Sequence, residues 1–204
     1  MPYSEHSDIE DLLHKARGGD ATAVGELLER YRRRLRHMVA VRMDPCLAPR
    51  LDPSDVVQEA LTVASRRLRE YLENPALDFY PWLRQIAWDR LLDTYRRHVR
   101  AGNRSVYREE PLGMSDTSAL ALADRIVAES TSLLKRLLRR ELLAQVRAAL
   151  LHLTPQDQEV LILRYLEELS TAETAAVLQI SETATKQRLL RAVQRLRERL
   201  EKRY

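Results

Sequence analysis

Hydrophobic residues recur at steps of three and four along most of the chain, the spacing that places side chains on one face of an α-helix. Within residues 1–100 this pattern predicts four helices. Gly18 and Gly19 end the first helix, and Asp20 is placed to cap the second. The second helix is followed by a loop that contains Pro45, Pro49 and Pro53.

The third predicted helix has two chemically different faces. Asp52 is a typical N-cap residue, and Pro53 suits the first helical position. The face expected to be buried is apolar and consists of Val56, Val57, Ala60, Leu61, Ala64, Leu68 and Tyr71. The opposite face is polar and consists of Asp55, Gln58, Glu59 and Thr62.

The fourth predicted helix starts near Pro81, after a break at Asn74 and Pro75. Its apolar face consists of Trp82, Leu83, Ile86, Ala87, Leu91 and Tyr95. The helix then continues into the basic residues Arg96 and Arg97. These four helices predict a small helical domain over residues 1–100.

Residues 101–132 are rich in glycine, proline, serine and threonine, so they are expected to be a linker with a short helical piece at 119–128. A second helical domain is predicted over residues 133–204. Thr154 and Pro155 are expected to start one helix in this domain, and Ser170 and Glu173 form the capping-box pattern of the next.

The last predicted helix begins after Ser181, and it has an apolar inner face of Leu189, Ala192, Val193, Leu196 and Leu200. A short helix, a three-residue turn and a long basic helix predict a helix-turn-helix. Its amino-terminal half contains side chains suited to base edges and phosphates, namely Thr183, Thr185, Lys186, Arg188 and Arg191. The alternative is an ordinary amphipathic helix with a solvated basic face.

Composition narrows the fold class to all-α. Among 204 residues there are only five glycines and eleven aromatic residues (eight Tyr, two Trp and one Phe), which disfavours sandwiches and barrels. No apolar run reaches the roughly 18 residues that span a bilayer, so no membrane insertion and a cytoplasmic location are expected. The single cysteine, Cys46, excludes an internal disulfide framework, and neither a metal nor a cofactor is expected.

The net charge of +4 is unevenly distributed. Residues 1–29 contain two Lys or Arg against seven Asp or Glu, a net charge of −5. Residues 84–108 contain seven Arg against two Asp, and residues 182–203 contain eight Lys or Arg against three Glu, a net charge of +5 each. Two separate basic stretches indicate a polyanionic partner that is contacted at two places.

Both halves resemble one family. The motif Leu153-Thr-Pro-Gln-Asp-Gln-Glu-Val-Leu, the segment 175–181 and the segment 186–197 resemble region 4 of bacterial RNA polymerase sigma factors of the extracytoplasmic-function group. Asp55-Val-Val-Gln-Glu59 and Trp82-Leu-Arg-Gln-Ile-Ala87 resemble region 2 of the same group. The two resemblances occur in the expected order and cover about four fifths of the chain.

The resemblance implies a sigma factor that binds core RNA polymerase and directs promoter recognition and opening. It implies that Asp55, Gln58 and Glu59 dock on the polymerase clamp helices, and that residues 158–169 lie near the surface that meets the polymerase flap. For promoter DNA, it implies that the loop at 73–80 captures a flipped base. The implied minus-ten contacts are Arg90, Arg96 and Arg97, and the implied minus-thirty-five contacts are Thr183, Thr185, Lys186, Arg188 and Arg191. The existence of an anti-sigma partner is left open.

Five positions depart from the family pattern. Trp88 and Asp89 stand where family members usually have Arg and Asn, Gln179 replaces the usual turn glycine, and Ala184 and Thr185 replace the common Thr-Val pair. Two other classes of function fit the sequence less well than a sigma factor. A stand-alone helix-turn-helix regulator would leave Asp55 to Arg97 without a purpose. An enzyme such as a recombinase is disfavoured because the sequence has no nucleophile beside a base, no paired metal-binding acids and no phosphate-binding glycine loop.

Overall fold

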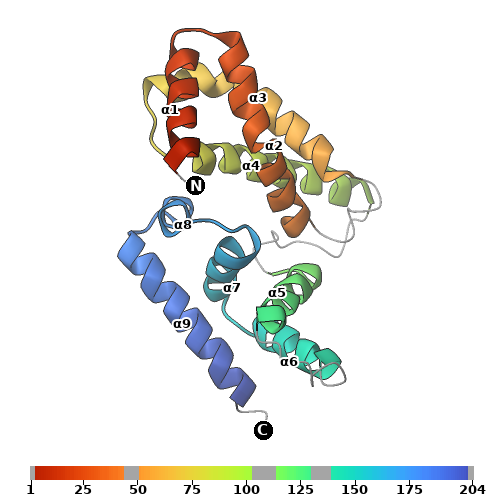
Figure 1. Cartoon of the computed structure of the whole chain (residues 1–204). Helices are drawn as coiled ribbons and strands as arrows, with labels where there is room; N and C mark the ends of the chain where they lie inside the picture. The colour runs from red at the N-terminus through yellow and green to blue at the C-terminus, as the bar shows by residue number, and fades with distance from the viewer. Residues whose placement is uncertain (1–2, 44–50, 103–113, 130–138, 202–204) are drawn as a thin grey trace. The chain divides into compact units, whose positions relative to one another are not determined.

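The computed structural model describes residues 3–43, 51–102, 114–129 and 139–201. Within these ranges all regular elements are helical, which confirms the all-α expectation. The helices form two compact units, one made of α1 to α4 and the other of α5 to α9 (Figure 1).

The first unit contains α1 (Tyr3–Arg17), α2 (Ala21–Arg42), α3 (Pro53–Glu73) and α4 (Phe79–Gly102). The turn between α1 and α2 passes through Gly19, whose φ of 88° lies in the left-handed region that glycine adopts without strain. The Asp20 carboxylate then accepts hydrogen bonds from the backbone N–H groups of Thr22 and Ala23, so the predicted cap of α2 is confirmed.

The core of this unit lies where α3 packs against α2 and α4. The predicted apolar stripe of α3 is buried, except that Tyr71 is half-buried. Asp52 caps α3 by accepting a 2.7 Å hydrogen bond from the backbone N–H of Ser54, and this bond lowers the pKa of the Asp52 carboxyl. Helix α4 begins two residues earlier than predicted, because the Trp82 N–H donates to the Asp78 carbonyl oxygen.

The second unit contains α5 (Asp116–Glu129), α6 (Arg139–Leu151), α7 (Pro155–Leu161), the π-helix η2 (Ile162–Leu166), α8 (Thr171–Leu178) and α9 (Glu182–Glu201). Helix α5 extends the short helical piece expected within the linker. It packs on α6 and η2 and buries Ala119, Leu122, Ala123 and Val127. These residues follow helical spacing, so α5 is part of the second unit rather than an isolated piece of linker.

The side chain of Gln158 links three parts of this unit. Its Nε2 donates to the Leu150 and Leu151 carbonyl oxygens at 3.0 and 3.2 Å, and its Oε1 accepts from the Met114 N–H at 3.0 Å. Gln158 is buried, so these hydrogen bonds offset the cost of removing its amide from water. The last turn of α6 and the start of the α5 segment are thereby fixed to α7.

The helix-turn-helix consists of α8 and α9 (Figure 1). Ser170 and Glu173 form the predicted capping box, and the Ser181 hydroxyl accepts from the Ala184 N–H at 3.1 Å. Gln179 ends α8 with a φ of 54°, the left-handed conformation for which the family usually has glycine.

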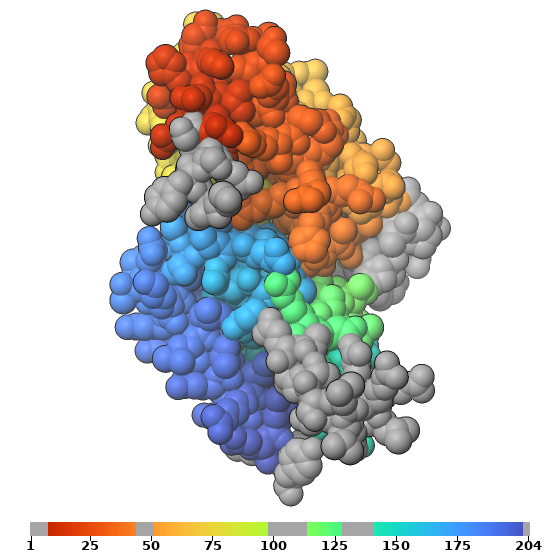
Figure 2. Space-filling view, viewed as in Figure 1, coloured from red at the N-terminus to blue at the C-terminus, as the bar shows by residue number. Residues whose placement is uncertain are grey.

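Helix α9 buries Ala192 and Leu196, as predicted. Val193 is 40% exposed, however, so its assignment to the inner face was wrong. The buried face of α9 is centred on Thr185, Ala192 and Leu196, which turns Val193 towards solvent. The other side of α9 is open to solvent, and the helix forms part of the surface of its unit (Figure 2).

Candidate polymerase and nucleic-acid interfaces

The polar face of α3 is exposed where the sequence predicts. Asp55, Gln58 and Glu59 all lie on the side opposite the buried stripe. The Gln58 Oε1 atom accepts a 2.9 Å hydrogen bond from Arg32 on α2, and Arg32 is also paired with Glu29 at 2.7 Å. This face therefore presents a carboxylate pair and an amide held in one orientation by an arginine.

The basic end of α4 contacts that same face. Arg97 lies 3.6 Å from the Glu59 carboxylate and donates to the Thr94 hydroxyl at 3.3 Å. Arg97 is 61% exposed and Glu59 is 53% exposed, so water and ions screen the pair. A residue expected to contact polymerase is thus adjacent to one expected to contact DNA.

The arginines of α4 also have acidic neighbours within the helix. Asp93 is paired with Arg90 at 2.9 Å and with Arg96 at 3.8 Å. Partial burial raises the pKa of Asp89 on the preceding turn, while Arg90 opposes that shift. Sequence reasoning counted the charge of this stretch but missed the bridging role of Asp93, although its i+3 spacing from Arg90 could have indicated it.

Trp88, one of the departures from the family pattern, is half-buried on α4. The guanidinium carbon of Arg42 lies 5.4 Å from the centre of the Trp88 ring, within the range of a cation–π interaction. Arg42 is the last residue of α2. The tryptophan therefore packs the end of α2 against α4.

An aromatic cluster supports the segment between α3 and α4. Tyr71 stacks on Trp82 with ring centres 4.4 Å apart, and Phe79 lies 5.6 Å from each of these rings. The Tyr71 hydroxyl donates a 3.0 Å hydrogen bond to the Leu77 carbonyl oxygen. Burial raises the pKa of Tyr71 to about 12. This arrangement fixes the segment that the resemblance associates with base capture.

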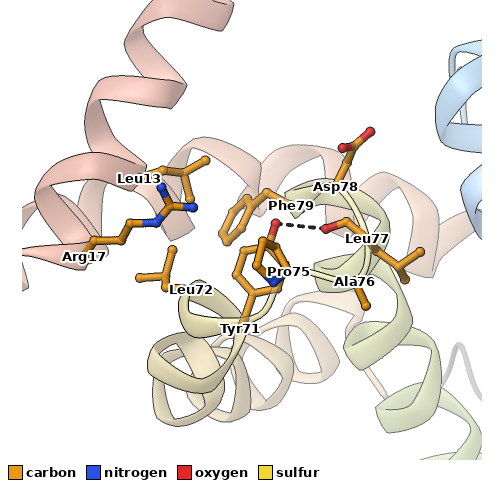
Figure 3. Close-up of a pocket in the computed structure, with 9 residues that line it drawn as sticks. All are labelled: Leu13, Arg17, Tyr71, Leu72, Pro75, Ala76, Leu77, Asp78 and Phe79. Carbon is orange, nitrogen blue, oxygen red and sulfur yellow. Dashed lines mark hydrogen bonds between the residues drawn. The ribbon is translucent and has the colours of Figure 1, made fainter.

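A pocket of about 340 Å³ opens beside this cluster (Figure 3). Its walls come from α1, from the end of α3 and from the segment that leads into α4. They combine apolar and aromatic side chains with polar surface, and Arg17 and Asp78 are the charged residues. We call it the loop pocket, and it is lined by Leu13, Arg17, Tyr71, Leu72, Pro75, Ala76, Leu77, Asp78 and Phe79.

The predicted reading residues of α9 do not all share one face. Thr185 is only 1% exposed, and its hydroxyl donates to the Ser181 carbonyl oxygen at 3.1 Å. This burial contradicts the predicted contact of Thr185 with DNA. Thr183, Lys186 and Arg191 are exposed, and Arg188 is half-buried. Lys186 and Arg188 lie on different flanks of the helix, because residues two apart do not face the same way.

Residues 158–169, expected near the flap-binding surface, are mostly core. Gln158, the apolar residues and even Glu167 are buried. Only Glu168 is exposed, while Glu159, Arg164 and Tyr165 are half-buried. A partner on this side would meet these four side chains and little of the apolar surface.

Among the residues that the structure describes, no three His, Cys, Asp or Glu side chains are grouped to hold a metal ion. A search of the same residues finds no helix long and apolar enough to cross a membrane.

The chain matches two family descriptions, "Sigma-70 region 2" over residues 27–101 and "Sigma-70, region 4" over residues 143–196. It is 36% identical to an RNA polymerase sigma-E factor of Streptomyces antibioticus, with 89% of each chain covered. It is 29% identical to the ECF RNA polymerase sigma factor BldN of Streptomyces coelicolor, over 95% of this chain and 66% of that protein.

A solved structure titled as CnrH in complex with the cytosolic domain of CnrY is similar in fold. Its TM-score is 0.53 at 24% sequence identity, and the match covers 95% of this chain and 97% of the other.

A four-helix unit that matches region 2, together with a helix-turn-helix unit that matches region 4, defines a DNA-binding protein of transcription initiation. The chain belongs to the extracytoplasmic-function group of RNA polymerase sigma factors. It binds RNA polymerase and promoter DNA and directs transcription initiation. A stand-alone regulator is not favoured, because region 2 is present as well as region 4.

Proposed function

We propose that Asp55, Gln58 and Glu59 form the surface that docks on core polymerase. The observation that supports this most directly is their exposure on one face of α3, opposite the buried residues from Val56 to Leu68. The bond from Arg32 holds the Gln58 amide in place, which reduces the side-chain entropy lost on binding.

We propose that α4 contacts the minus-ten element through Arg90, Arg96 and Arg97. All three are at least partly accessible, and an arginine paired with an exposed carboxylate can exchange it for a phosphate at little cost. The loop pocket is proposed to hold an unpaired base, because the aromatic rings of Tyr71 and Phe79 line it beside polar and charged groups.

We propose that α9 reads the minus-thirty-five element through Thr183, Lys186, Arg188 and Arg191. Ser181, Glu182 and Thr183 at the amino end of α9 are exposed, and the amino end of a recognition helix is the part that meets base edges. Thr185 is excluded from this set because its side chain packs inside the unit.

We infer that the protein has no catalytic chemistry of its own and acts in the cytoplasm, where core polymerase and promoters are found. A protein partner that sequesters it is also proposed, since the similar CnrH structure contains a bound cytosolic domain of CnrY. Such a partner would compete with polymerase for the first unit, the second unit or both.

Binding of the full chain to core polymerase tests the docking surface. The variant Gln58→Ala/Glu59→Ala is expected to bind core at least ten-fold more weakly, while its circular dichroism spectrum stays unchanged. Glu70→Ala is the matched control, because Glu70 is an exposed acid farther along the same helix. Equal affinity of the double variant and the wild-type chain would contradict the proposed surface.

A further inference from the structure

A buried carboxylate joins α9 to α7 within the second unit. Arg195 on α9 donates a 2.7 Å hydrogen bond to the Asp157 Oδ2 atom on α7. The Asp157 side chain is 3% exposed, whereas that of Arg195 is 52% exposed. Thr154 donates to the same oxygen at 2.8 Å and accepts from the Asp157 N–H at 3.2 Å. The cap of α7 therefore includes a side chain from α9.

This pair differs from the other arginine contacts of α9. Arg197, for example, is paired at 2.7 Å with Glu201 of its own helix, and both are largely exposed. A carboxylate that is removed from water needs a charged or hydrogen-bonding partner, and its loss leaves an uncompensated group. Arg195 supplies that partner from an element 38 residues away in the sequence.

Arg195 lies far enough along α9 for its contact to fix the direction of the helix axis. Arg195 lies thirteen residues after Glu182, which is about 20 Å along a helix that rises 1.5 Å per residue. The amino end of α9 is fixed separately, by the Ser181 cap and the buried Thr185. Two fixed points far apart define the direction of the helix axis, and hence the angle at which Lys186 and Arg188 are presented.

We propose that Arg195 is a positioning residue and Asp157 its anchor, and that together they set the pose of α9 for promoter reading. This inference rests on the proposed role of α9 at the minus-thirty-five element. Arg195 belongs to the basic stretch 182–203, whose charge indicates a polyanionic partner. The guanidinium instead neutralises a carboxylate within the protein.

The variant Asp157→Asn distinguishes positioning from a simple charge effect. Removing a negative charge near a DNA-binding helix strengthens binding if only electrostatics matters. If Asp157 positions α9, the same change weakens binding, by about ten-fold. The experiment uses holoenzyme reconstituted from core polymerase and the full chain, and duplexes selected by the wild-type holoenzyme from a promoter library. Stronger binding by Asp157→Asn would overturn the proposal.

The salt dependence of Arg195→Ala provides a second, independent readout. Losing one phosphate contact lowers the slope of log affinity against log salt by about 1. A positioning role predicts an unchanged slope, weaker binding and an altered ranking of promoters. The double variant Asp157→Asn/Arg195→Ala should be no weaker than either single variant, since both remove the same contact. A reduced slope with an intact ranking would show a phosphate contact and contradict the proposal.

Two further variants separate this inference from the function on which it rests. Arg199→Ala is the matched control, because Arg199 is an exposed arginine of the same helix and should leave the ranking intact. Arg188→Ala should change the ranking. If Arg188→Ala changes the ranking of promoters and Asp157→Asn does not change it, only the positioning role is wrong. If Arg188→Ala leaves the ranking unchanged, both the reading role of α9 and the inference fail.

Discussion

Glu59 on α3 and Arg97 on α4 lie 3.6 Å apart, so the proposed polymerase-docking face and the proposed minus-ten face meet at an ion pair. The two residues are 38 positions apart in the sequence and belong to different motifs. Both are exposed by more than half, which limits the contribution of the pair to stability to about 1 kcal/mol or less. Their contact places two functions on one surface at little cost to the fold.

Single substitutions at this pair should separate the two functions. Glu59→Gln is expected to weaken core binding, whereas Arg97→Ala should leave core binding unchanged and reduce promoter-complex formation by the holoenzyme. Urea unfolding of each variant should differ from wild type by less than about 1 kcal/mol. Titration with core polymerase, followed by DNA binding at saturating core, measures the two effects. An Arg97→Ala variant that loses core affinity as Glu59→Gln does would contradict the separation.

Substitutions in α9 should divide specificity from general affinity. Arg188 lies near the amino end of the helix and could supply roughly 1–3 kcal/mol of discrimination through a guanine. Arg188→Ala is therefore expected to change which promoters the holoenzyme selects from a randomised library. Thr185→Ser is an informative comparison, because the buried hydroxyl is retained and no base contact is lost. A Thr185→Ser variant with altered preference would show that the burial of Thr185 does not remove it from the reading set.

The turn of the helix-turn-helix contains a strained residue whose replacement should stabilise the protein. Gln179 has a φ of 54°, a conformation that costs a residue with a Cβ atom roughly 1 kcal/mol relative to glycine. Gln179→Gly is expected to raise the free energy of unfolding of the second unit by about 0.5–1 kcal/mol. Gln187→Gly, within α9, should lower it by about 1 kcal/mol. Urea unfolding followed by circular dichroism measures both changes. A lower free energy of unfolding in Gln179→Gly would contradict the claim that Gln179 is strained.

The phenol of Tyr71 should ionise late in an alkaline titration. Burial raises the pKa of Tyr71 to about 12, above its ordinary value of 10.0, so folding favours the protonated form. The resulting stabilisation is complete below pH 10 and is lost as the pH rises through about 12. Ultraviolet difference titration of wild type and Tyr71→Phe should show that the variant lacks a transition near 12. If Tyr71→Phe instead lacks a transition near 10, the phenol of Tyr71 is solvated and the expected shift is contradicted.

Local signals made much of the fold predictable. The caps at Asp20, Asp52, Ser170 and Ser181 depend on hydrogen bonds to residues two or three positions away, so a short stretch of sequence contains all that is needed. The polar face of α3 was predictable for a similar reason. The position of this face around the helix follows from the long, regular apolar stripe on the opposite side.

Other features depend on tertiary contacts that spacing does not specify. The bonds from Arg32 to Gln58 and from Arg195 to Asp157 join residues 26 and 38 positions apart. The burial of Thr185 and the exposure of Val193 depend on which face of α9 packs against α6, α7 and α8. The helical piece at 119–128 was predicted, but its place in the second unit was not, because the serine and threonine around it resemble a linker although its alanine and leucine residues supply a buried face.

Transcription in vitro tests the central claim most directly, that this chain brings core polymerase to promoters and starts transcription there. Purified core polymerase and the full chain would be combined with duplex templates whose upstream sequences are randomised. The account predicts transcripts that begin at a fixed distance from a shared pair of upstream elements and that are lost in Gln58→Ala/Glu59→Ala but retained in Glu70→Ala. The account would be contradicted if the chain binds the templates but transcription is the same with and without it.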